Sequence, residues 1–444
     1  MISSADDLRP RTGGEIATRF ILLLAFAATA VLVEPVAVQA GGPIGGWLPG
    51  PPMAAARDSH TATVLKDGRV LVVGRPGAEI YDPSTKRWSQ AGTPVMARTN
   101  ATATLLAGGR VLVAAGIVAD RSVPNAEIYD PTRNAWSAVA SMAGRRYDHT
   151  ATLLLDGRVL IVGGIRSAVT LDSVEIYDPK TDAWAAAANL PSARSNHTAM
   201  LLPDGRVLVA GGNGSAGEVL ADAALYDPVA NTWSRTGIMR TPRRAALSAR
   251  LDDGRILVVG GIDNPQPDQV SAEIFNPGSE TWSPAGPTTQ PVLRDGFAMT
   301  TLRDGRVLVC GGSSPVFEAP ALAVGYVYDP DQDRWSATID MAQGRVDHSA
   351  SLLPDGRILV AGGRDAYTNG TSLSTTEIFD ASLVTNTPAA APATSSTAGA
   401  APAVGRSPIQ TVSPLGVGLL TGGIAAIVVF LIATALVRRG RRRV

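Results

Sequence analysis

Seven copies of one sequence unit occupy most of this chain of 444 residues. Each copy reads approximately Arg-x-x-His-Thr-Ala-Thr-Leu-Leu-x-Asp-Gly-Arg-Val-Leu-Val-x-Gly-Gly, followed after a variable stretch by Glu-Ile-Tyr-Asp-Pro and a Trp. The glycine before the second arginine marks the copies, at Gly68, Gly109, Gly157, Gly205, Gly254, Gly305 and Gly356. A unit of about fifty residues cannot bury a core alone, so the copies must pack against one another.

The third copy shows how the unit translates into strands. Residues 149–155 alternate polar and apolar side chains, as a half-buried strand does, and the following Asp-Gly pair at Gly157 predicts a two-residue hairpin. Val159–Val162 is an aliphatic run suited to a strand covered on both faces. Glu175–Tyr177 is the third strand, and Trp184 marks the fourth beyond an Asp-Pro turn. Four strands in each of seven copies predict an all-β fold, a seven-bladed β-propeller.

The glycines and aromatic residues carry a resemblance to a known family. A Gly-Gly pair precedes a Tyr, and a Trp follows seven positions after that Tyr, as at Tyr177 and Trp184. This pattern resembles the kelch repeat, and the Asp-Gly-Arg-Val-Leu-Val form is similar to the kelch propeller of galactose oxidase and of many bacterial surface proteins. The resemblance spans about residues 44–382 and implies the propeller fold, whereas kelch propellers host both binding and catalysis.

The ends of the repeat array predict how the propeller closes. The seventh copy stops at Asp380 without reaching a Trp, and an unmatched Trp47 precedes the first copy. Trp47 lies ten residues before Arg57, the offset that also separates Trp88 from Arg98. The N-terminal segment is therefore expected to form the outer strand of the last blade, which removes a free sheet edge.

The N-terminal flank has the pattern of a secretory signal, assigned to residues 1–40. Fourteen apolar residues at 20–33 follow Arg19, and Val38-Gln39-Ala40 resembles a cleavage site. The apolar stretch is too short to span a bilayer comfortably.

The C-terminal flank predicts a membrane anchor. Residues 415–437 contain no charged side chain, and the segment 438–444 that follows carries five arginines, a cytoplasmic signature. Residues 383–414 are rich in Ala, Pro, Ser and Thr, a composition that predicts an extended stalk. We therefore expect the propeller, residues 41–382, to lie outside the cell membrane on a single-pass anchor.

Composition limits the partners. Lys and Arg number 39 and Asp and Glu also number 39, so the chain carries no net charge, which argues against a nucleic-acid partner. Cys310 is the single cysteine and cannot form an internal disulfide. No cofactor is expected. The expected partners are an extracellular protein, a glycan or a small anionic molecule, with the membrane contacted through the C-terminal helix.

One repeated charge is the candidate binding feature. Every copy has an arginine three residues before the His position, and symmetry predicts that these arginines surround the mouth of the central channel. Guanidinium groups bind carboxylate or phosphate in a bidentate manner, so the set could recognise an anion. The ligand-binding candidates are Arg57, Arg98, Arg146, Arg194, Arg243, Arg294 and Arg345.

A scaffold role is the alternative for these arginines, because most copies offer a glutamate at the start of the third strand. These glutamates are Glu79, Glu127, Glu175, Glu273 and Glu377. Ala224 and Tyr326 stand at the glutamate position in the two other copies. An arginine that faces one of these gaps would keep its guanidinium free for a ligand. Pairing within a blade would leave Arg194 and Arg294 free, and pairing between blades Arg243 and Arg345.

Two further sets are interpreted as scaffold. The second arginine of each copy is expected to pair across strands with the Asp of Tyr-Asp-Pro; these are Arg69, Arg110, Arg158, Arg206, Arg255, Arg306 and Arg357. The four histidines share one repeat position but belong to different blades, so they are not expected to bind a metal; they are His60, His149, His197 and His348. The mid-strand place of Cys310 does not support copper oxidase activity of the galactose oxidase kind.

The sequence thus favours a surface-anchored binding propeller. The connections between second and third strands vary in length and share one face, where we place the binding site. The alternative is an extracellular kelch-propeller enzyme that acts on sugars or peptides.

Overall fold

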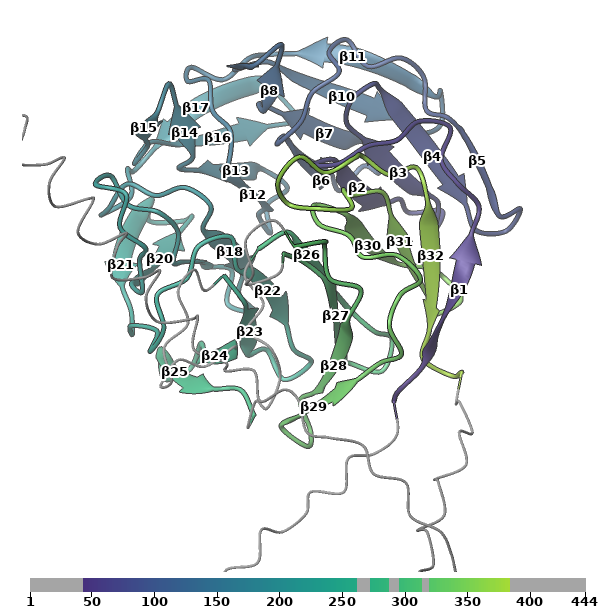
Figure 1. Ribbon diagram of the computed structural model, residues 1–444. Coiled ribbons are helices and arrows are strands. Elements are labelled where there is room, and N and C mark those ends of the chain that lie inside the picture. The colour runs from purple at the N-terminus through teal and green to yellow at the C-terminus, as the bar shows by residue number, and fades with distance from the viewer. Residues whose placement is uncertain (1–42, 262–271, 287–294, 314–318, 384–444) are drawn as a thin grey trace, which may run out of the picture. The chain divides into compact units, whose positions relative to one another are not determined.

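The computed structural model describes residues 43–261, 272–286, 295–313 and 319–383, and within them seven antiparallel four-stranded sheets form the blades of a propeller (Figure 1). From the inside outwards, blade 1 consists of β2 (Thr61–Val64), β3 (Val70–Val73), β4 (Ala78–Asp82) and β5 (Arg87–Gln90). Blade 2 consists of β6 (Thr102–Leu105), β7 (Val111–Ala114), β10 (Ala126–Asp130) and β11 (Ala135–Val139). Blade 3 consists of β12 (Thr150–Leu153), β13 (Val159–Val162), β16 (Val174–Asp178) and β17 (Ala183–Ala187). Blade 4 consists of β18 (Thr198–Leu201), β19 (Val207–Ala210), β20 (Ala223–Asp227) and β21 (Thr232–Arg235). Blade 5 consists of β22 (Leu247–Arg250), β23 (Ile256–Val259), β24 (Ala272–Asn276) and β25 (Thr281–Pro284). Blade 6 consists of β26 (Phe297–Thr301), β27 (Val307–Gly311), β28 (Gly325–Asp329) and β29 (Arg334–Ala337). Blade 7 consists of β30 (Ser349–Leu352), β31 (Ile358–Ala361), β32 (Thr376–Asp380) and β1 (Gly46–Gly50).

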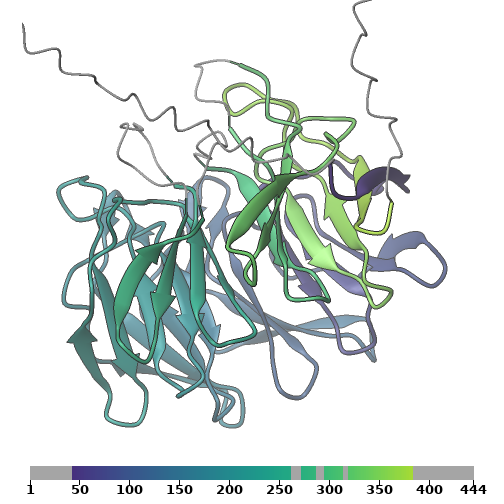
Figure 2. The ribbon, with the colours of Figure 1, turned by 90° about the horizontal axis from the view of Figure 1, so that it is seen from below.

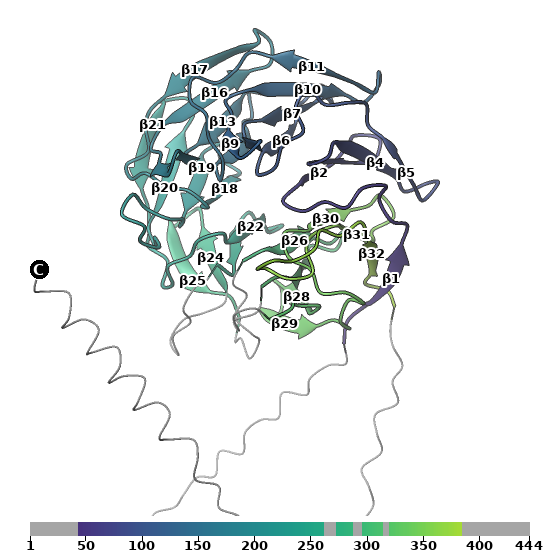
Figure 3. The same ribbon diagram turned by 45° about the horizontal axis from the view of Figure 1, so that its top comes forward.

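The ring of blades closes as predicted. The innermost strands contact one another in cyclic order, from β2 through β6, β12, β18, β22 and β26 to β30 and back to β2. β1, from the N-terminal segment, pairs antiparallel with β32, and Trp47 lies opposite Phe379 (Figure 3). Segments from opposite ends of the repeat array therefore form one blade together, and the last blade has all four of its strands.

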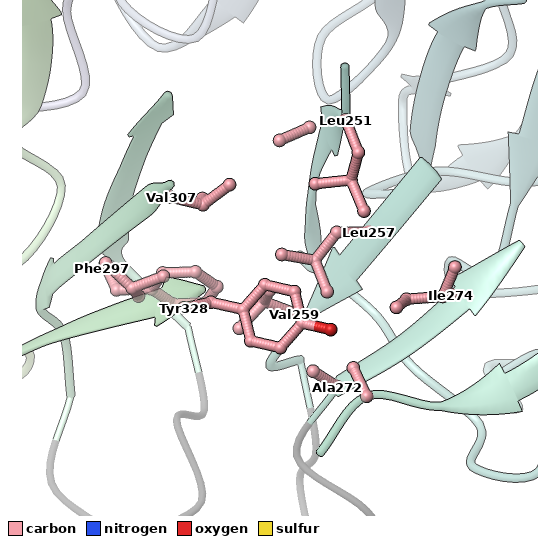
Figure 4. Packing of buried hydrophobic residues seen from close by; sticks show 11 residues of the cluster. Leu251, Leu257, Val259, Ala272, Ile274, Phe297, Val307 and Tyr328 are labelled. Carbon is pink, nitrogen blue, oxygen red and sulfur yellow. The ribbon is translucent and has the colours of Figure 1, made fainter. Parts of the chain in front are cut away.

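Apolar side chains fill the interfaces between blades rather than one central core. The second strand of each blade is buried on both faces, as all four residues of β13 show, whereas the outermost strands are largely exposed. Seven hydrophobic clusters lie one at each blade interface. Between blades 5 and 6, Leu257 and Val259 face Phe297, Val307 and Tyr328 (Figure 4). Burial of apolar area between neighbours is thus the main stabilising term of the propeller.

Each outer-strand tryptophan links its blade to the preceding one. Its ring stacks at 4.9–5.2 Å between centroids on the Tyr or Phe of the third strand, in a tilted arrangement. Its indole Nε1 donates a hydrogen bond to a backbone carbonyl of the blade before it. The donor and acceptor pairs are Trp47–Ile339, Trp88–Pro51, Trp136–Ala91, Trp184–Ala140, Trp233–Ala188, Trp282–Gly237 and Trp335–Ala285.

The Asp-Gly hairpins differ from the expected two-residue turn. In blade 3, Gly157 N donates to Leu154 O at 3.0 Å and Leu154 N donates to Arg158 O at 2.8 Å, so three residues form the loop. Gly157 has a φ of 89°, the left-handed conformation that completes a three-residue hairpin. The same five-residue connection separates the first two strands of all seven blades.

The second arginines also have different partners from those expected. Arg158 pairs with Asp156 of its own hairpin, with 2.7 Å between Nη2 and Oδ2. The Asp of Tyr-Asp-Pro instead accepts hydrogen bonds inside its own turn, as when Lys180 N donates to Asp178 Oδ1 at 2.8 Å. The predicted cross-strand pairs are therefore wrong, because a partner two residues away competes more effectively. The Asp–Arg pairs of this kind are Asp67–Arg69, Asp156–Arg158, Asp204–Arg206, Asp253–Arg255, Asp304–Arg306 and Asp355–Arg357.

The predicted signal segment, most of the stalk, the membrane helix and the basic tail lie outside the described residues, apart from Leu383. In the part of the chain that is described, no helix is long and apolar enough to cross a membrane.

Candidate functional site

The two faces of the propeller carry different connections. The turn face, defined here by the Asp-Gly hairpins and the Asp-Pro turns, has connections of constant length. The loop face, defined by the links between second and third strands and between successive blades, has connections of varying length. Its loops between second and third strands differ in length: the loop of blade 1 comprises residues 74–77, whereas that of blade 7 comprises residues 362–375. In a side view, the yellow-green loop between β31 and β32 projects from the side opposite the tight turns (Figure 2).

The candidate arginines lie at the base of the loop face, but six of them are buried and ion-paired. The side chains of these six are at most 1% exposed. Each pairs with an acidic residue of its own blade. The pairs are Arg57–Glu79, Arg98–Glu127, Arg146–Glu175, Arg194–Asp222, Arg243–Glu273 and Arg345–Glu377. Pairing is therefore within blades, and the between-blade alternative is wrong.

Arg146 shows what these arginines do. Its Nη2 donates to Glu175 Oε1 at 2.6 Å, and its Nη1 donates to the carbonyls of Gly163 and Ser173 at 2.9 and 3.0 Å. Glu175 also accepts a hydrogen bond from Ala143 N at 2.7 Å. The guanidinium thus fastens both ends of one long loop to the connection from the preceding blade, and its donors are occupied by the scaffold.

The arginine backbone also joins neighbouring blades. The carbonyl of Arg194, in blade 4, accepts a hydrogen bond from Gly164 N of blade 3 at 2.9 Å. A side chain on Gly163 would meet this carbonyl, since an ideal Cβ there lies 2.4 Å from Arg194 O. The Gly-Gly pair is therefore required by close approach of the next blade.

The prediction of free arginines at the glutamate gaps is wrong for Arg194. Asp222 replaces the missing glutamate, and its Oδ2 accepts from Arg194 Nη2 at 2.9 Å. A carboxylate two residues earlier in the chain thus reaches the same guanidinium. Arg294, the other arginine predicted to be free, lies outside the described residues. The six candidate arginines that the structure describes belong to the scaffold of the loop face, because their guanidinium groups are buried and paired with carboxylates.

The four histidines link neighbouring blades. Thr102 Oγ1 lies 3.0 Å from His149 Nε2, and Thr150 Oγ1 lies 2.8 Å from His197 Nε2, each across a blade boundary. Burial, followed by the positive charge of Arg146, lowers the pKa of His149 to about 3, so the ring is neutral in the folded protein. The scaffold interpretation of the histidines agrees with this geometry.

A second circle of residues, which sequence reasoning missed, surrounds the channel mouth. We call it the axial ring; it comprises the residues immediately before the His position, Ser59, Asn100, Asp148, Asn196, Ala245, Gly296 and Asp347. All seven have a positive φ, between 49° and 68°. Backbone hydrogen bonds join successive members, as when Asn196 N donates to Asp148 O at 3.0 Å. The frequent Asn, Asp and Gly at this position, residues that tolerate the left-handed region, were the available signal.

Acidic and amide groups gather on the axial ring. Asp148 accepts hydrogen bonds from the amides of Asn100 at 3.2 Å and Asn196 at 3.1 Å. Burial raises the pKa of Asp148, although the two amides oppose the rise. Burial also raises the pKa of Asp347, although its ion pair with Arg364 opposes the rise. Two carboxyl groups with raised pKa values thus lie on the axial ring, where a ligand of the loop face would be in reach.

Comparison with known proteins agrees with the repeat pattern. The profile of the kelch motif matches residues 98–143 and 145–191, and that of the KLHDC2/KLHL20/DRC7 kelch-repeats domain matches residues 185–363. Among solved structures, a fungal alcohol oxidase of the AA5 family in complex with copper is similar, with a TM-score of 0.63 and 19% sequence identity over 76% of each chain. This likeness concerns the fold. No protein of curated function matches the chain.

The residues of this chain do not fit a copper centre like the one named for that oxidase. No cluster of three or more His, Cys, Asp or Glu side chains arranged to hold a metal occurs within the described ranges. The histidines lie in four different blades, and the Nε2 atom of each faces a hydroxyl or thiol group of the preceding blade. The imidazoles are thus used between blades.

Proposed function

Because the chain is a kelch-repeat β-propeller, we propose that it is a binding module anchored at the cell surface, which recognises a protein, a glycan or a small anionic ligand through its loop face. Kelch propellers are in general binding platforms, and the fold alone does not identify the ligand. The observation that carries the proposal is the contrast between the faces. Loops of unequal length stand on a repeated, buried Arg–carboxylate framework, an arrangement suited to recognition.

The chemistry of the described residues favours binding over catalysis. Cys310 Sγ lies 3.6 Å from His348 Nε2, the nearest approach of a thiol to an imidazole in this part of the chain. Burial raises the pKa of the thiol to about 12, and burial followed by the charge of Arg345 lowers that of the imidazole to about 3. A neutral thiol beside a buried neutral imidazole is a poor nucleophile. Arg345 and Glu377 beside them are paired with each other.

Surface placement is supported by the sequence of the two flanks and is tested on intact cells. Added protease should release a soluble fragment that ends within residues 383–414, since an extended stalk is accessible backbone. Failure of the protease to release this fragment, with the propeller left intact in the cells, would contradict the placement. Cells that display the full chain, probed with protein and glycan arrays, should then show saturable binding, whereas turnover of a bound sugar or peptide would favour the enzyme alternative.

A further inference from the structure

A polar recess lies on the loop face where the first and last blades meet. Blade 1 has the shortest loop between its second and third strands, residues 74–77, whereas blades 2 and 7 have residues 115–125 and 362–375 there. The recess left by the short loop has a volume of about 550 Å³, within the range of small-molecule sites. In Figure 1 the yellow-green loop between β31 and β32 extends towards β2 at this junction.

One ion-pair cluster forms the floor of the recess, and it carries more negative than positive charge because two carboxylates face one guanidinium. Arg364 Nη2 pairs with Asp347, and Arg364 Nε lies 3.7 Å from Asp58 Oδ1. Asp58 also accepts hydrogen bonds from Ser59 Oγ at 3.0 Å and Ser372 Oγ at 2.5 Å. Two carboxylates therefore share one guanidinium, and the hydroxyl groups of Ser59 and Ser372 stabilise the carboxylate of Asp58. This network fixes the side chains in place before any ligand arrives.

Arg75 on the short loop is the uncommitted charge of the recess. Its side chain is exposed, and no ion pair or side-chain hydrogen bond involves it within the described ranges. This differs from the buried arginines beneath the loops, whose donors are occupied. An exposed guanidinium at the rim of a recess is suited to bidentate capture of a carboxylate.

The remaining polar groups offer hydrogen-bond acceptors. Ser59 and Ser372 use their hydroxyl protons on Asp58 and keep oxygen lone pairs, while Asn100 uses its amide N–H on Asp148 and keeps its carbonyl oxygen. A ligand that carries several hydroxyl groups can donate to these oxygens. Pro76 contributes an apolar surface beside them.

We propose that this recess binds a sugar acid, with its carboxylate on Arg75 and its hydroxyl groups donating to the oxygens of Asn100, Ser59 and Ser372. The proposal rests on the proposed function and specifies its ligand class and site. A dianionic phosphate would fit less well, because Asp58 and Asp347 lie beneath the recess and, among the described residues that line it, only Arg75 carries an unpaired charge. A neutral sugar would leave Arg75 unused.

The test is calorimetric titration of the full-length chain in detergent with galacturonate, which carries one carboxylate, and with galactose as the neutral counterpart. We expect galacturonate to bind at least about tenfold more tightly than galactose. Arg75→Gln should weaken galacturonate binding about tenfold, the loss expected for one charge-assisted bidentate contact. Arg166→Gln is the matched control, because Arg166 is exposed on the same face but lies two blades away. Neither substitution should change the unfolding temperature.

Equal affinity for the two sugars, or an Arg75→Gln chain that binds galacturonate as tightly as the parent, would overturn the assignment. Absence of galacturonate binding would also overturn it. If an array ligand still bound through the loop face in that case, the sugar-acid inference alone would fail and the proposed function would stand. If no ligand bound this face at all, both would fail.

Discussion

The turn face and the loop face are built from the same seven repeats, yet they have become different surfaces. On the turn face, every blade has the same five-residue connection between its first two strands, and in six blades a partly exposed Asp–Arg pair lies within it. On the loop face, the connections between second and third strands differ in length, from the short loop of residues 74–77 to the long loop of residues 362–375. Repetition therefore specifies the scaffold, and variation is confined to one side, where a ligand can be recognised without altering the ring.

The ion pairs of the two faces also differ in how much stability the protein loses when one partner is removed. An exposed ion pair contributes little to stability, because water screens it and both side chains lose freedom. A buried pair contributes little net stability either, but removing one partner leaves a desolvated charge and is costly. The variable loops thus stand on buried ion pairs whose disruption is costly, so loop length can differ between blades while a buried Arg–carboxylate pair is present in six of them.

The largest effect is expected from opening the ring. Deletion of residues 41–56 removes β1, and blade 7 then loses its outer strand and exposes the edge of β32. We expect loss of cooperative folding or a fall of more than about 10 °C in the unfolding temperature, measured by circular dichroism. Trp47→Phe is the control, since it keeps an aromatic ring beside Phe379 and loses the hydrogen bond to Ile339, about 1 kcal/mol, with part of the indole packing. A deletion variant as stable as its parent would mean that β1 does not close the ring.

The second prediction compares the ion pairs of the two faces. Arg146→Met leaves Glu175 buried without its cation and should lower the free energy of unfolding by about 3–5 kcal/mol. Arg158→Met on the turn face removes a partly exposed pair and should cost less than about 1 kcal/mol. Urea denaturation of both variants measures the difference. Similar losses at the two positions would show that burial does not distinguish the faces.

The third prediction compares two glycines of blade 3 that both have a positive φ. An ideal Cβ at Gly163 lies 2.4 Å from Arg194 O, whereas at Gly157 no heavy atom lies within 4 Å. Gly157→Ala should cost about 1–2 kcal/mol through backbone strain alone. Gly163→Ala should cost about 1–3 kcal/mol more, because the carbonyl of the next blade must move. Equal costs in thermal unfolding would remove the argument for close blade approach.

The fourth prediction concerns pH. Burial first, and then the charge of Arg146, lowers the pKa of His149 to about 3, so the unfolded chain takes up a proton near pH 6.5 that the folded protein does not. Stability is therefore lost as the pH falls from about 6.5 towards 3, by about 1.4 kcal/mol per pH unit for each such histidine. His149→Ala introduces the residue that Ala101 and Ala246 supply at the same repeat position, and it should reduce the slope by that amount. Unchanged slopes in denaturation at pH 4–6.5 would contradict the buried neutral state.

Repetition explains how much the sequence could predict. The blades, the closure by Trp47 and the scaffold role of the repeated arginines follow from patterns that recur seven times or nearly so. The repeat pattern alone does not decide whether Arg146 pairs with Glu175 of its own blade or with a glutamate of a neighbouring blade. The partner of Arg194 could not be predicted in this way, because Asp222 lies off the repeat position and reaches the guanidinium only through the path of its loop. The recess at Arg75 was missed for a similar reason. It depends on three neighbouring loops of unequal length, which no single copy records.

A steric block on each face tests most directly whether ligands bind the loop face. Val169→Cys places a thiol on the exposed hairpin of β14 (Ile165–Arg166) and β15 (Val169–Thr170), and Val229→Cys places one on the turn face. Cys310 is buried with a raised pKa and should not react, so a large maleimide polymer modifies only the new thiol. Binding of the array ligand to the full chain should fall at least about tenfold with the polymer at position 169 and stay unchanged with it at position 229. Binding that is blocked from position 229 and unaffected from position 169 would contradict the account.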